Sequence, residues 1–231
     1  MSAAPSLSII IPCLNEADGI RAALDALAPL RRRGVEVLVV DGGSADDTLT
    51  RARESVDLVL CAPRGRAAQM NHGAERARGN VLLFLHADTR LPDGADTLIG
   101  SGLSASGRSW GRFDVTIAGR HPLLKVIAAA MNLRSRWTGI ATGDQAIFVT
   151  RKAFEDAGGY PRIALMEDIA LTVTLKRADA PLCLEARVIT SGRRWEKHGV
   201  LRTVFLMWRL RLAYRLGADP EKLALHYAGH R

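Results

Sequence analysis

The sequence predicts an α/β fold in which helices flank a mostly parallel central sheet and a helical extension follows at the C-terminal end. Within the first ninety residues, four short apolar runs alternate with three segments that have a helical apolar face. Such alternation is typical of strand–helix–strand units, whose right-handed crossovers make the strands parallel. The run at 81–85, VLLFL, is apolar without alternation, which indicates a strand buried on both faces.

We expect strands at residues 7–11, 35–40, 57–61 and 81–85, separated by three helices. Asn15 with Asp18, and Ser44 with Asp47, have the spacing of a capping box at the start of the first two helices. Because the carboxyl ends of parallel strands meet at one edge of a sheet, the polar residues after each strand should gather in one crevice. These residues are Asn15, Glu16, Asp41, Arg64, Arg66, His86 and Asp88. Taken singly, each could also serve a purely structural role as a helix cap, a dipole partner or a solvated cation.

The second half of the chain has a less regular pattern. Apolar residues alternate over 110–117, which indicates a half-buried strand, and residues 123–131 form an apolar helix too short to span a bilayer. A strand is expected at 146–150 and a short helix at 152–157. Glu167 and Asp168 open a further helix, where two acidic side chains would in any case complement the helix dipole.

Residues 200–216 are apolar except for a few polar positions, among them four arginines. As a helix, they would place Leu201, Val204, Phe205, Trp208 and Leu212 in one stripe and Leu206, Leu210 and Tyr214 on the other side. Four arginines argue against a membrane span, since each costs about 2.5 kcal/mol or more near a bilayer centre. We therefore expect residues 200–217 to contact either an anionic membrane surface or a second subunit of a homodimer.

The composition is that of a soluble globular protein, with 48% hydrophobic and 24% charged residues. The formal net charge of +8 is compatible with several anionic partners. Cys13, Cys61 and Cys183 are odd in number and widely spaced, so neither a disulfide framework nor a zinc site is expected. These features favour a cytoplasmic location, free or at the inner face of the membrane. No basic stripe interleaved with aromatic residues indicates nucleic-acid binding.

Several motifs together resemble those of the inverting family-2 glycosyltransferases, which have the Rossmann-like GT-A fold. SIIIPCLNE (8–16), VVDGGSADDT (39–48) and Gly65-Arg66 with Gln69, Asn71 and Gly73 match the nucleotide-binding half in order and spacing. His86-Ala87-Asp88 stands where the family has its Asp-x-Asp metal motif. Gly158-Gly159-Tyr160 followed by Glu167-Asp168 resembles the motif with the catalytic base. The resemblance covers about residues 7–198, and the chain looks closest to the small bacterial subgroup named radical-SAM/selenodomain-associated transferases.

The resemblance implies a hexosyltransferase-like enzyme that transfers a sugar from a nucleoside-diphosphate sugar, such as a UDP-sugar, to an acceptor hydroxyl with inversion. Asp168 would be the catalytic base, and spacing alone does not separate it from Glu167. Asp88 and His198, with His86, would hold Mn²⁺ or Mg²⁺, and an imidazole favours the softer manganese ion. The implied donor-binding residues are Pro12, Asn15, Glu16, Asp41, Gly43, Arg66, Gln69, Asn71 and Ala87. The implied acceptor-side residues are Asp144, Arg194 and Trp195, and Trp195 is alternatively a core residue.

The resemblance also implies a GT-A domain at 1–198 and a helical extension at 199–231. Within the domain, 1–92 would be the nucleotide-binding half and 93–198 the acceptor half. A sugar nucleotidyltransferase is an alternative, but PCLNE (12–16) stands where that class has its glycine-rich triphosphate loop. A non-catalytic nucleotide-sugar-binding protein is another, supported only by His86. The acceptor is not identified by the sequence, and a lipid-linked hydroxyl is among the candidates.

Overall fold

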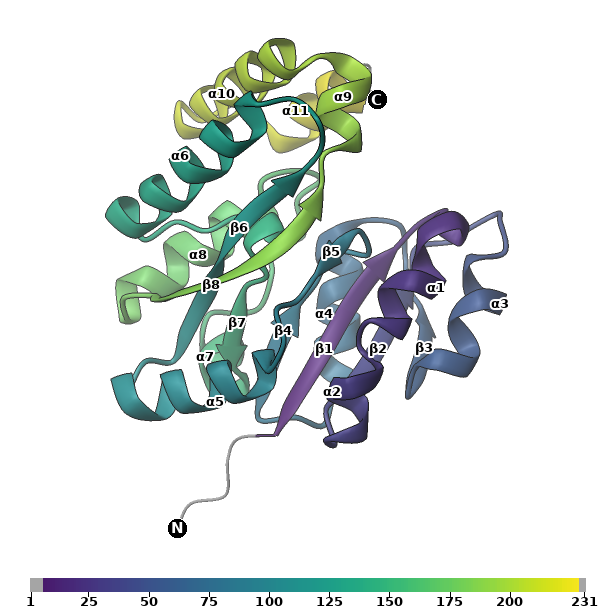
Figure 1. Cartoon of the computed structure of the whole chain (residues 1–231). Coiled ribbons are helices and arrows are strands. Elements are labelled where there is room, and N and C mark those ends of the chain that lie inside the picture. The colour runs from purple at the N-terminus through teal and green to yellow at the C-terminus, as the bar shows by residue number, and fades with distance from the viewer. Residues whose placement is uncertain (1–5, 229–231) are drawn as a thin grey trace.

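The computed structural model describes residues 6–228 and has one eight-stranded sheet in the order β3-β2-β1-β4-β7-β6-β8-β5 (Figure 1). Strands β1 to β4 are parallel to their neighbours within this group, so their carboxyl ends lie at one edge, as expected. The strands are β1 (Leu7–Cys13), β2 (Glu36–Asp41), β3 (Leu58–Cys61), β4 (Val81–Phe84), β5 (Thr89–Arg90), β6 (Trp110–Ala118), β7 (Phe148–Thr150) and β8 (Leu182–Ser191).

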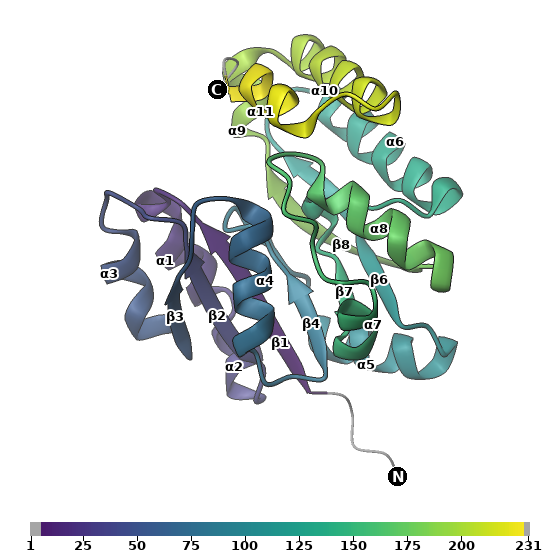
Figure 2. The ribbon, with the colours of Figure 1, turned by 180° about the vertical axis from the view of Figure 1, so that it is seen from behind.

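Helices cover both faces of the sheet, which Figures 1 and 2 show from opposite sides. The helices are α1 (Ala17–Asp25), α2 (Ala28–Arg32), α3 (Thr48–Ala52), α4 (Arg66–Arg76), α5 (Ala95–Ser106), α6 (Leu123–Thr138), α7 (Arg151–Asp156), α8 (Glu167–Ala178), α9 (Arg193–His198), α10 (Val200–Arg215) and α11 (Pro220–Ala228), with short 3-10 turns at η1 (Arg53–Ser55) and η2 (Gly143–Gln145). The predicted α/β fold class, with helices at the C-terminal end, is confirmed.

The central strands are apolar without alternation because each strand supplies two hydrophobic cores. Ile9 and Ile11 pack with α1, α2 and α5 on one face, while Ile10 packs with α4, α7 and α8 on the other. On the second face, a Cβ atom on Gly73 of α4 would lie 2.5 Å from Ile10 Cγ2. The close approach of α4 to β1 therefore depends on glycine at this position.

The second half of the sheet is mixed, since β7 runs antiparallel to β4 and β6 while β8 is parallel to β6. The expectation of a half-buried β6 is wrong, because α6 and the main core bury both of its faces. The polar positions that produced the alternation include Arg112, which is fully buried and paired with Asp114. Arg136 binds the other carboxylate oxygen of Asp114 at 2.9 Å, so the buried charges are compensated within the fold.

The two predicted capping boxes are also wrong, because residues of the loop after β2 supply the caps of both helices. At the start of α3, Asp46 Oδ1 accepts from Thr48 N at 3.0 Å. Asn15 Oδ1 accepts a hydrogen bond from Ala45 N at 2.9 Å instead of capping α1. The first amides of α1 are satisfied from the second loop, where Thr48 Oγ1 accepts from Glu16 N and Asp46 Oδ2 accepts from Ala17 N. Parallel pairing of β1 with β2 places these loops side by side, a long-range arrangement that local spacing cannot reveal.

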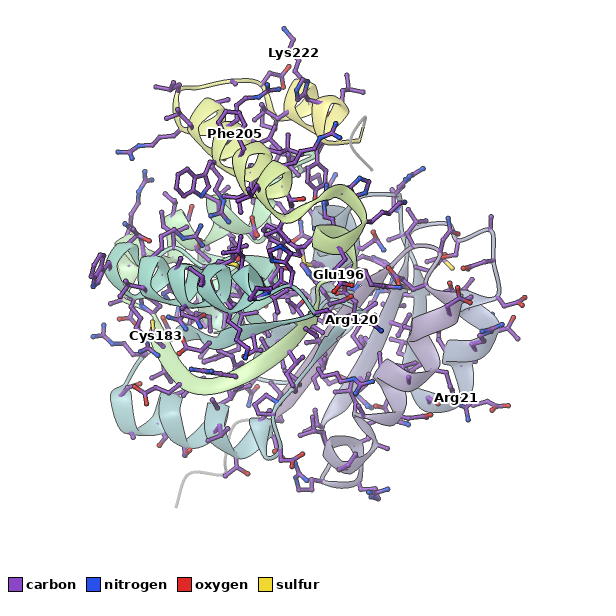
Figure 3. All side chains as sticks on the ribbon, turned by 45° about the horizontal axis from the view of Figure 1, so that its top comes forward. Arg21, Arg120, Cys183, Glu196, Phe205 and Lys222 are labelled. Atoms are coloured by element: carbon purple, nitrogen blue, oxygen red, sulfur yellow. The ribbon has the colours of Figure 1, made fainter. Side chains whose placement is uncertain are left out.

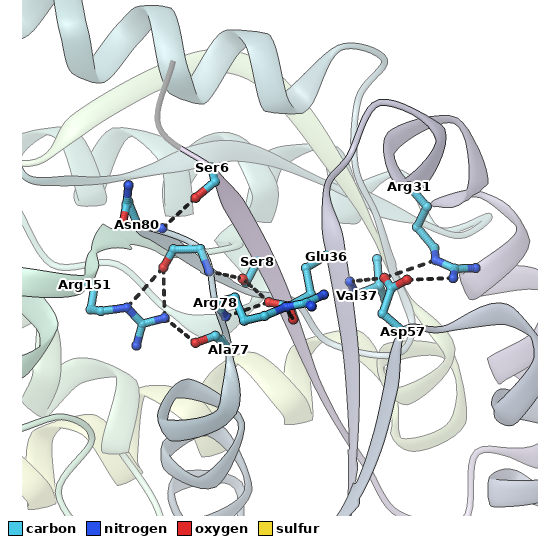
Figure 4. Close-up of polar contacts among 11 residues, drawn as sticks. Ser6, Ser8, Arg31, Glu36, Val37, Asp57, Ala77, Arg78, Asn80 and Arg151 are labelled. Atoms are coloured by element: carbon cyan, nitrogen blue, oxygen red, sulfur yellow. Dashed lines mark hydrogen bonds and ion pairs between the residues drawn. The ribbon is translucent and has the colours of Figure 1, made fainter. Parts of the chain in front are cut away.

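The amino-terminal edge of the sheet carries a polar network with structural partners (Figure 4). Arg151 donates four hydrogen bonds, of 2.6–3.1 Å, to the carbonyls of Ala74, Ala77 and Gly79 at and beyond the end of α4. A cation at this position satisfies carbonyls that the helix leaves unpaired and complements its dipole. Nearby, Glu36 accepts from Arg78 at 2.7 Å. The network ties α4 and α7 to the sheet.

Candidate active site

The carboxyl edge of the sheet opens into two adjoining pockets. The β1-side pocket, of about 320 Å³, is lined by residues that follow β1 and β4 and by the start of α4. The α8-side pocket, of about 230 Å³, is lined by η2, the start of α8 and the helices α9 and α10. The two pockets share six residues, and a molecule in one pocket can therefore meet a molecule in the other. The shared residues are Arg66, His86, Asp88, Leu165, Glu167 and Tyr227.

Seven predicted donor-side or metal residues line the β1-side pocket: Pro12, Glu16, Arg66, Gln69, His86, Ala87 and Asp88. Burial raises the pKa of Glu16; Arg193 opposes this effect and the Asp88 carboxylate adds to it. Arg193 reaches Glu16 from α9 at 3.7 Å. The pocket therefore joins acidic side chains of two strand ends to an arginine from the C-terminal helices.

Asp41 is buried and supports the loop after β2 instead of lining either pocket. Its Oδ2 accepts hydrogen bonds from Gly43 N at 2.8 Å and Ser44 N at 2.9 Å. Gly43 has a φ of 91°, which glycine adopts without steric cost. Ser44 Oγ in turn accepts from Asn15 N at 2.9 Å. Asp41, Gly43 and Asn15 are therefore brought together, but as the frame of the pocket.

Gln69 and Asn71 are held by backbone groups on opposite sides of α4. Gln69 Nε2 donates to the carbonyls of Cys13 at 2.8 Å and Val40 at 2.7 Å, which fixes the wall of the β1-side pocket. Asn71 exchanges two hydrogen bonds with the backbone of Tyr160, at 2.8 and 2.9 Å. Asn71 thereby ties α4 to the turn before α8 and lies outside both pockets.

Glu167 and Asp168 begin α8 and face the crevice in different ways. Asp168 lines the α8-side pocket alone, and its two carboxylate oxygens accept from Gly143 N at 2.8 Å and Ile169 N at 2.7 Å. Burial raises the pKa of Asp168, although these two amides oppose the rise. Glu167 lines both pockets, and burial together with the Asp168 charge raises its pKa to about 7. Both acids are thus more basic than ordinary carboxylates.

His86 is paired with a carboxylate at the junction of the pockets. Its Nδ1 lies 3.3 Å from Asp144 Oδ1. Burial opposes ionisation of Asp144, but the hydrogen bond to His86 and the charges of Arg66 and Arg194 hold its pKa below the ordinary value. The ring fits only because position 143 is glycine, where a Cβ atom would lie 2.3 Å from His86 Nε2. His86 therefore packs against the same residue whose amide holds Asp168.

The predicted metal ligands are not assembled around a common ion position. Within residues 6–228, no group of three or more His, Cys, Asp or Glu side chains is arranged to hold an ion. Asp88 is exposed and lines both pockets, whereas His198 lies at the end of α9 and lines neither. A single carboxylate beside a substrate phosphate is a common arrangement for Mg²⁺ and related ions. The residues present therefore fit an ion that arrives with a diphosphate and is held by Asp88.

The predicted acceptor-side residues Asp144, Arg194 and Trp195 all line the α8-side pocket. The Arg194 guanidinium stacks on the ring of Tyr227, 3.7 Å from its centroid, and also hydrogen-bonds its hydroxyl. Trp195 also packs against the cluster formed by α6 and the start of α10, so this tryptophan belongs both to the pocket wall and to a hydrophobic cluster. The C-terminal helices thus complete the pocket.

Three residues at this site were not predicted from the sequence. Gly143 seats His86 and holds Asp168, and Tyr227 of α11 lines both pockets. Arg134 of α6 has its Nε and Nη2 atoms buried without a hydrogen-bond partner, and its pKa is lowered by burial although Asp168 raises it. The TGDQ segment at 142–145 predicts only the lead into a strand. Nothing in the spacing of Arg134 or Tyr227 connects them to a strand end.

The N-terminal part of the chain, which contributes to both pockets, matches a known protein family. Residues 8–117 match the family model "Glycosyl transferase family 2". The N-terminal part of the chain is therefore similar to family-2 glycosyltransferases. Over 103 residues the chain is 42% identical to the "PGL/p-HBAD biosynthesis glycosyltransferase" of Mycobacterium bovis, covering 42% of this chain and 40% of that protein. It is 26% identical to the "Probable glycosyltransferase YdaM" of Bacillus subtilis, covering 94% of this chain and 56% of that protein. The chain thus spans about half the length of these glycosyltransferases.

Solved glycosyltransferase structures share the fold. The mannosyltransferase PcManGT of Pyrobaculum calidifontis, in complex with GDP-Man and Mn²⁺, superimposes with a TM-score of 0.65 at 24% identity, covering 97% of this chain and 69% of that one. TarS of S. aureus in complex with UDP-GlcNAc gives a TM-score of 0.66 at 18% identity, covering 80% of this chain and 58% of that one. The chain therefore has a GT-A fold. None of these matches identifies the subgroup expected from the sequence, which stays a prediction.

Proposed function

We propose that this protein is a family-2 glycosyltransferase that transfers a sugar from a nucleoside-diphosphate sugar to an acceptor hydroxyl, with inversion at the anomeric carbon. The observation that carries the proposal is the wall shared by the two pockets, which bears Arg66, Asp88 and Glu167. A donor in the β1-side pocket would place its scissile bond at this wall, and an acceptor in the α8-side pocket would approach it from the other side. The similar structures were solved with GDP-Man or UDP-GlcNAc.

The nucleotide is assigned to the β1-side pocket. Pro12, Glu16 and Ala87 would line it, while Asp41, Asn15 and Gly43 support the adjacent loops. For Asp41 to contact the base or ribose directly, the loop at 41–44 would have to release some of its internal hydrogen bonds. Arg66 lies at the start of α4, so its guanidinium and the helix end favour a diphosphate there.

A divalent cation, Mn²⁺ or Mg²⁺, is proposed to accompany the diphosphate. Bound there, such an ion neutralises the negative charge that develops on the leaving diphosphate. Asp88 would hold it on the protein side, because its exposed carboxylate lies in both pockets. His86 is engaged with Asp144, and contact of His198 with the ion stays a prediction.

Asp168 is proposed as the general base. It lines only the acceptor-side pocket, and two backbone amides fix the orientation of its carboxylate. Its raised pKa makes it a better proton acceptor at neutral pH. Glu167 lies at the wall shared by the two pockets, closer to the position assigned to the donor. Its carboxyl group would contribute to the electrostatic potential at the sugar. The proton of the acceptor hydroxyl would pass to Asp168 as the hydroxyl oxygen attacks the anomeric carbon and the diphosphate leaves from the opposite face.

The Asp168→Asn variant tests this assignment. Release of UDP or GDP from a panel of nucleotide sugars, measured without acceptor as slow hydrolysis, should fall by about 10² or more, because general-base catalysis contributes about that much. Calorimetric titration with UDP and Mn²⁺ should give nearly unchanged affinity. The exposed Asp93→Asn variant is the control and should keep both properties.

The outcomes separate the competing functions. Lost UDP affinity in Asp168→Asn would place this residue in the binding site, and undiminished turnover would remove it as the base. Binding of UDP or GDP without any turnover in the wild-type protein would favour the non-catalytic binding protein. Formation of a nucleotide sugar from a nucleoside triphosphate and a sugar phosphate would instead favour the nucleotidyltransferase.

The remaining expectations stay proposals. They comprise the division into residues 1–92, 93–198 and 199–231, the radical-SAM/selenodomain-associated subgroup and a cytoplasmic location. Among the described residues, all three cysteines are free thiols, which is compatible with a reducing compartment. The sugar and the acceptor are left open.

A further inference from the structure

Helix α10 exposes a continuous apolar stripe on its outer face. Five large apolar side chains, spaced by three or four residues, have exposed fractions between 59% and 78%. They are Leu201, Phe205, Trp208, Leu212 and Leu216. Folded proteins rarely leave such a contiguous surface in water unless it meets a partner. We call this set the α10 stripe.

The opposite face of α10 is already occupied. Leu210 is buried and packs with Met166 and Leu223. Thr203 and Met207 line the α8-side pocket. The inner face therefore holds the helix on the protein, and the α10 stripe is not needed for that packing. Figure 3 shows Phe205 on α10 and Lys222 on α11 at one end of the molecule, far from Arg21 on α1.

The charged side chains of α10 itself are all cationic. Between Lys197 and Ala218 the sequence contains four arginines and no acidic residue. Helix α6 lies beside α10 in both ribbon views and also has no acidic residue (Figures 1 and 2). It adds the exposed side chains of Val126, Leu133 and Trp137. Helices α10 and α6 thus expose apolar and cationic side chains. These complement a surface that has anionic groups above an apolar interior.

A membrane span and a homodimer interface both fit the stripe less well. None of the described helices is both long enough and apolar enough to cross a bilayer. A two-fold homodimer would bring the same patch of each copy together. The α10 arginines would then oppose each other without carboxylates from the same helix to compensate them, and like charges across an interface are unfavourable.

We propose that the α10 stripe docks the protein on an anionic lipid bilayer surface. The aromatic side chains Phe205 and Trp208 would enter the interface between headgroups and acyl chains, and the exposed arginines of α10, Arg202, Arg209 and Arg215, would contact anionic headgroups. Because the inner face of α10 lines the α8-side pocket, docking would hold that pocket close to the membrane surface. This inference concerns binding alone and does not require the proposed sugar transfer.

Vesicle flotation tests the proposal with the whole chain. Wild-type protein should float with phosphatidylcholine vesicles that contain phosphatidylglycerol and stay unbound with pure phosphatidylcholine, and added salt should weaken binding. The double variant Phe205→Ser/Trp208→Ser should lose detectable binding. Circular dichroism and the melting temperature should be unchanged, since both side chains are about 70% exposed.

Two double variants, each lacking two arginines, separate the effect of the α10 arginines from the effect of the net charge. Arg202→Gln/Arg215→Gln should weaken binding to the anionic vesicles about 25-fold, from about fivefold per arginine near a lipid surface. Arg32→Gln/Arg53→Gln removes the same charge from exposed positions on α2 and η1 and should have little effect. Figure 1 places α2 at the end of the molecule away from α10.

Three outcomes would overturn the proposal. The first is no binding of wild-type protein to anionic vesicles. The second is equal weakening by the two charge variants, which would indicate attraction by net charge alone. The third is a wild-type dimer in light scattering that Phe205→Ser/Trp208→Ser dissociates, with no vesicle binding, which would make a second copy of the chain the occupant.

Discussion

Glu167 should make the free energy of unfolding of the protein decrease as the pH rises. Burial and the neighbouring Asp168 charge raise its pKa from 4.5 to about 7. Between these values the folded protein keeps a proton that the unfolded chain has released. Unfolding then releases a proton, so the free energy of unfolding falls as the pH rises. The contribution is fully present below about pH 4.5 and is lost as the pH passes about 7.

The size of the effect follows from the shift. From 4.5 to about 7 the difference corresponds to about 3 kcal/mol, at 1.36 kcal/mol per pKa unit. Glu167→Gln removes the ionisation and keeps the shape of the side chain. The variant should therefore become more stable relative to wild type as the pH increases, with a change in relative stability of up to about 3 kcal/mol.

Urea denaturation at pH 5 and pH 8, without nucleotide or metal, measures this difference. Glu185→Gln, an exposed glutamate of β8, is the matched control and should give the same small difference at both pH values. If Glu167→Gln differs from wild type by the same amount at both pH values, the burial argument is refuted. An equal pH dependence in the control would trace the effect to net charge instead.

Two further predictions concern the Arg151 network at the amino-terminal edge of the sheet and the glycine beside His86. Arg151→Met should lower the free energy of unfolding by about 3 kcal/mol in urea denaturation, because four charged hydrogen bonds to carbonyls are lost. The control is Lys152→Met, at the exposed neighbouring position, which should lower it by less than about 1 kcal/mol. Equal losses in the two variants would contradict the role of the network. Gly143→Ala should reduce donor turnover about 10-fold or more, because its Cβ would lie 2.3 Å from His86 Nε2. Gly19→Ala, where a Cβ meets nothing within 4 Å, is its control, and unchanged turnover in Gly143→Ala would show that the contact is dispensable.

The parallel half of the fold was predictable because short stretches of sequence mark each strand and the polar residues that follow it. Each apolar run is a strand, and the polar residues after the runs reach the same edge of the sheet. The capping boxes failed because the loops after β1 and β2 exchange hydrogen bonds across 29 or more residues, as between Asn15 and Ser44. The half-buried β6 failed because Arg112 looks solvent-facing in sequence but pairs with Asp114 inside the protein.

The site was predictable only where a residue belongs to a strand end or a motif. Asp88, Glu167 and Asp168 line the crevice as the sequence suggested. Asp41 was expected beside the nucleotide, and the structure places it within its own loop. Tyr227 reaches both pockets from the last helix, 139 residues after Asp88. Its position depends on how α10 and α11 pack, which no local pattern encodes.

His86 shows how one substitution in a motif can change the coupling within a site. A carboxylate at this strand end, as in the motif that the sequence resembles, would repel Asp144, whereas the imidazole pairs with it at 3.3 Å. The same ring rests against Gly143, and the Gly143 amide holds Asp168. The strand end that carries Asp88 toward the donor is therefore connected through two contacts to the proposed base. A shift of this strand end would reach Asp168 through His86 and Gly143. The proposed donor and acceptor sites are therefore linked through packing as well as through charge.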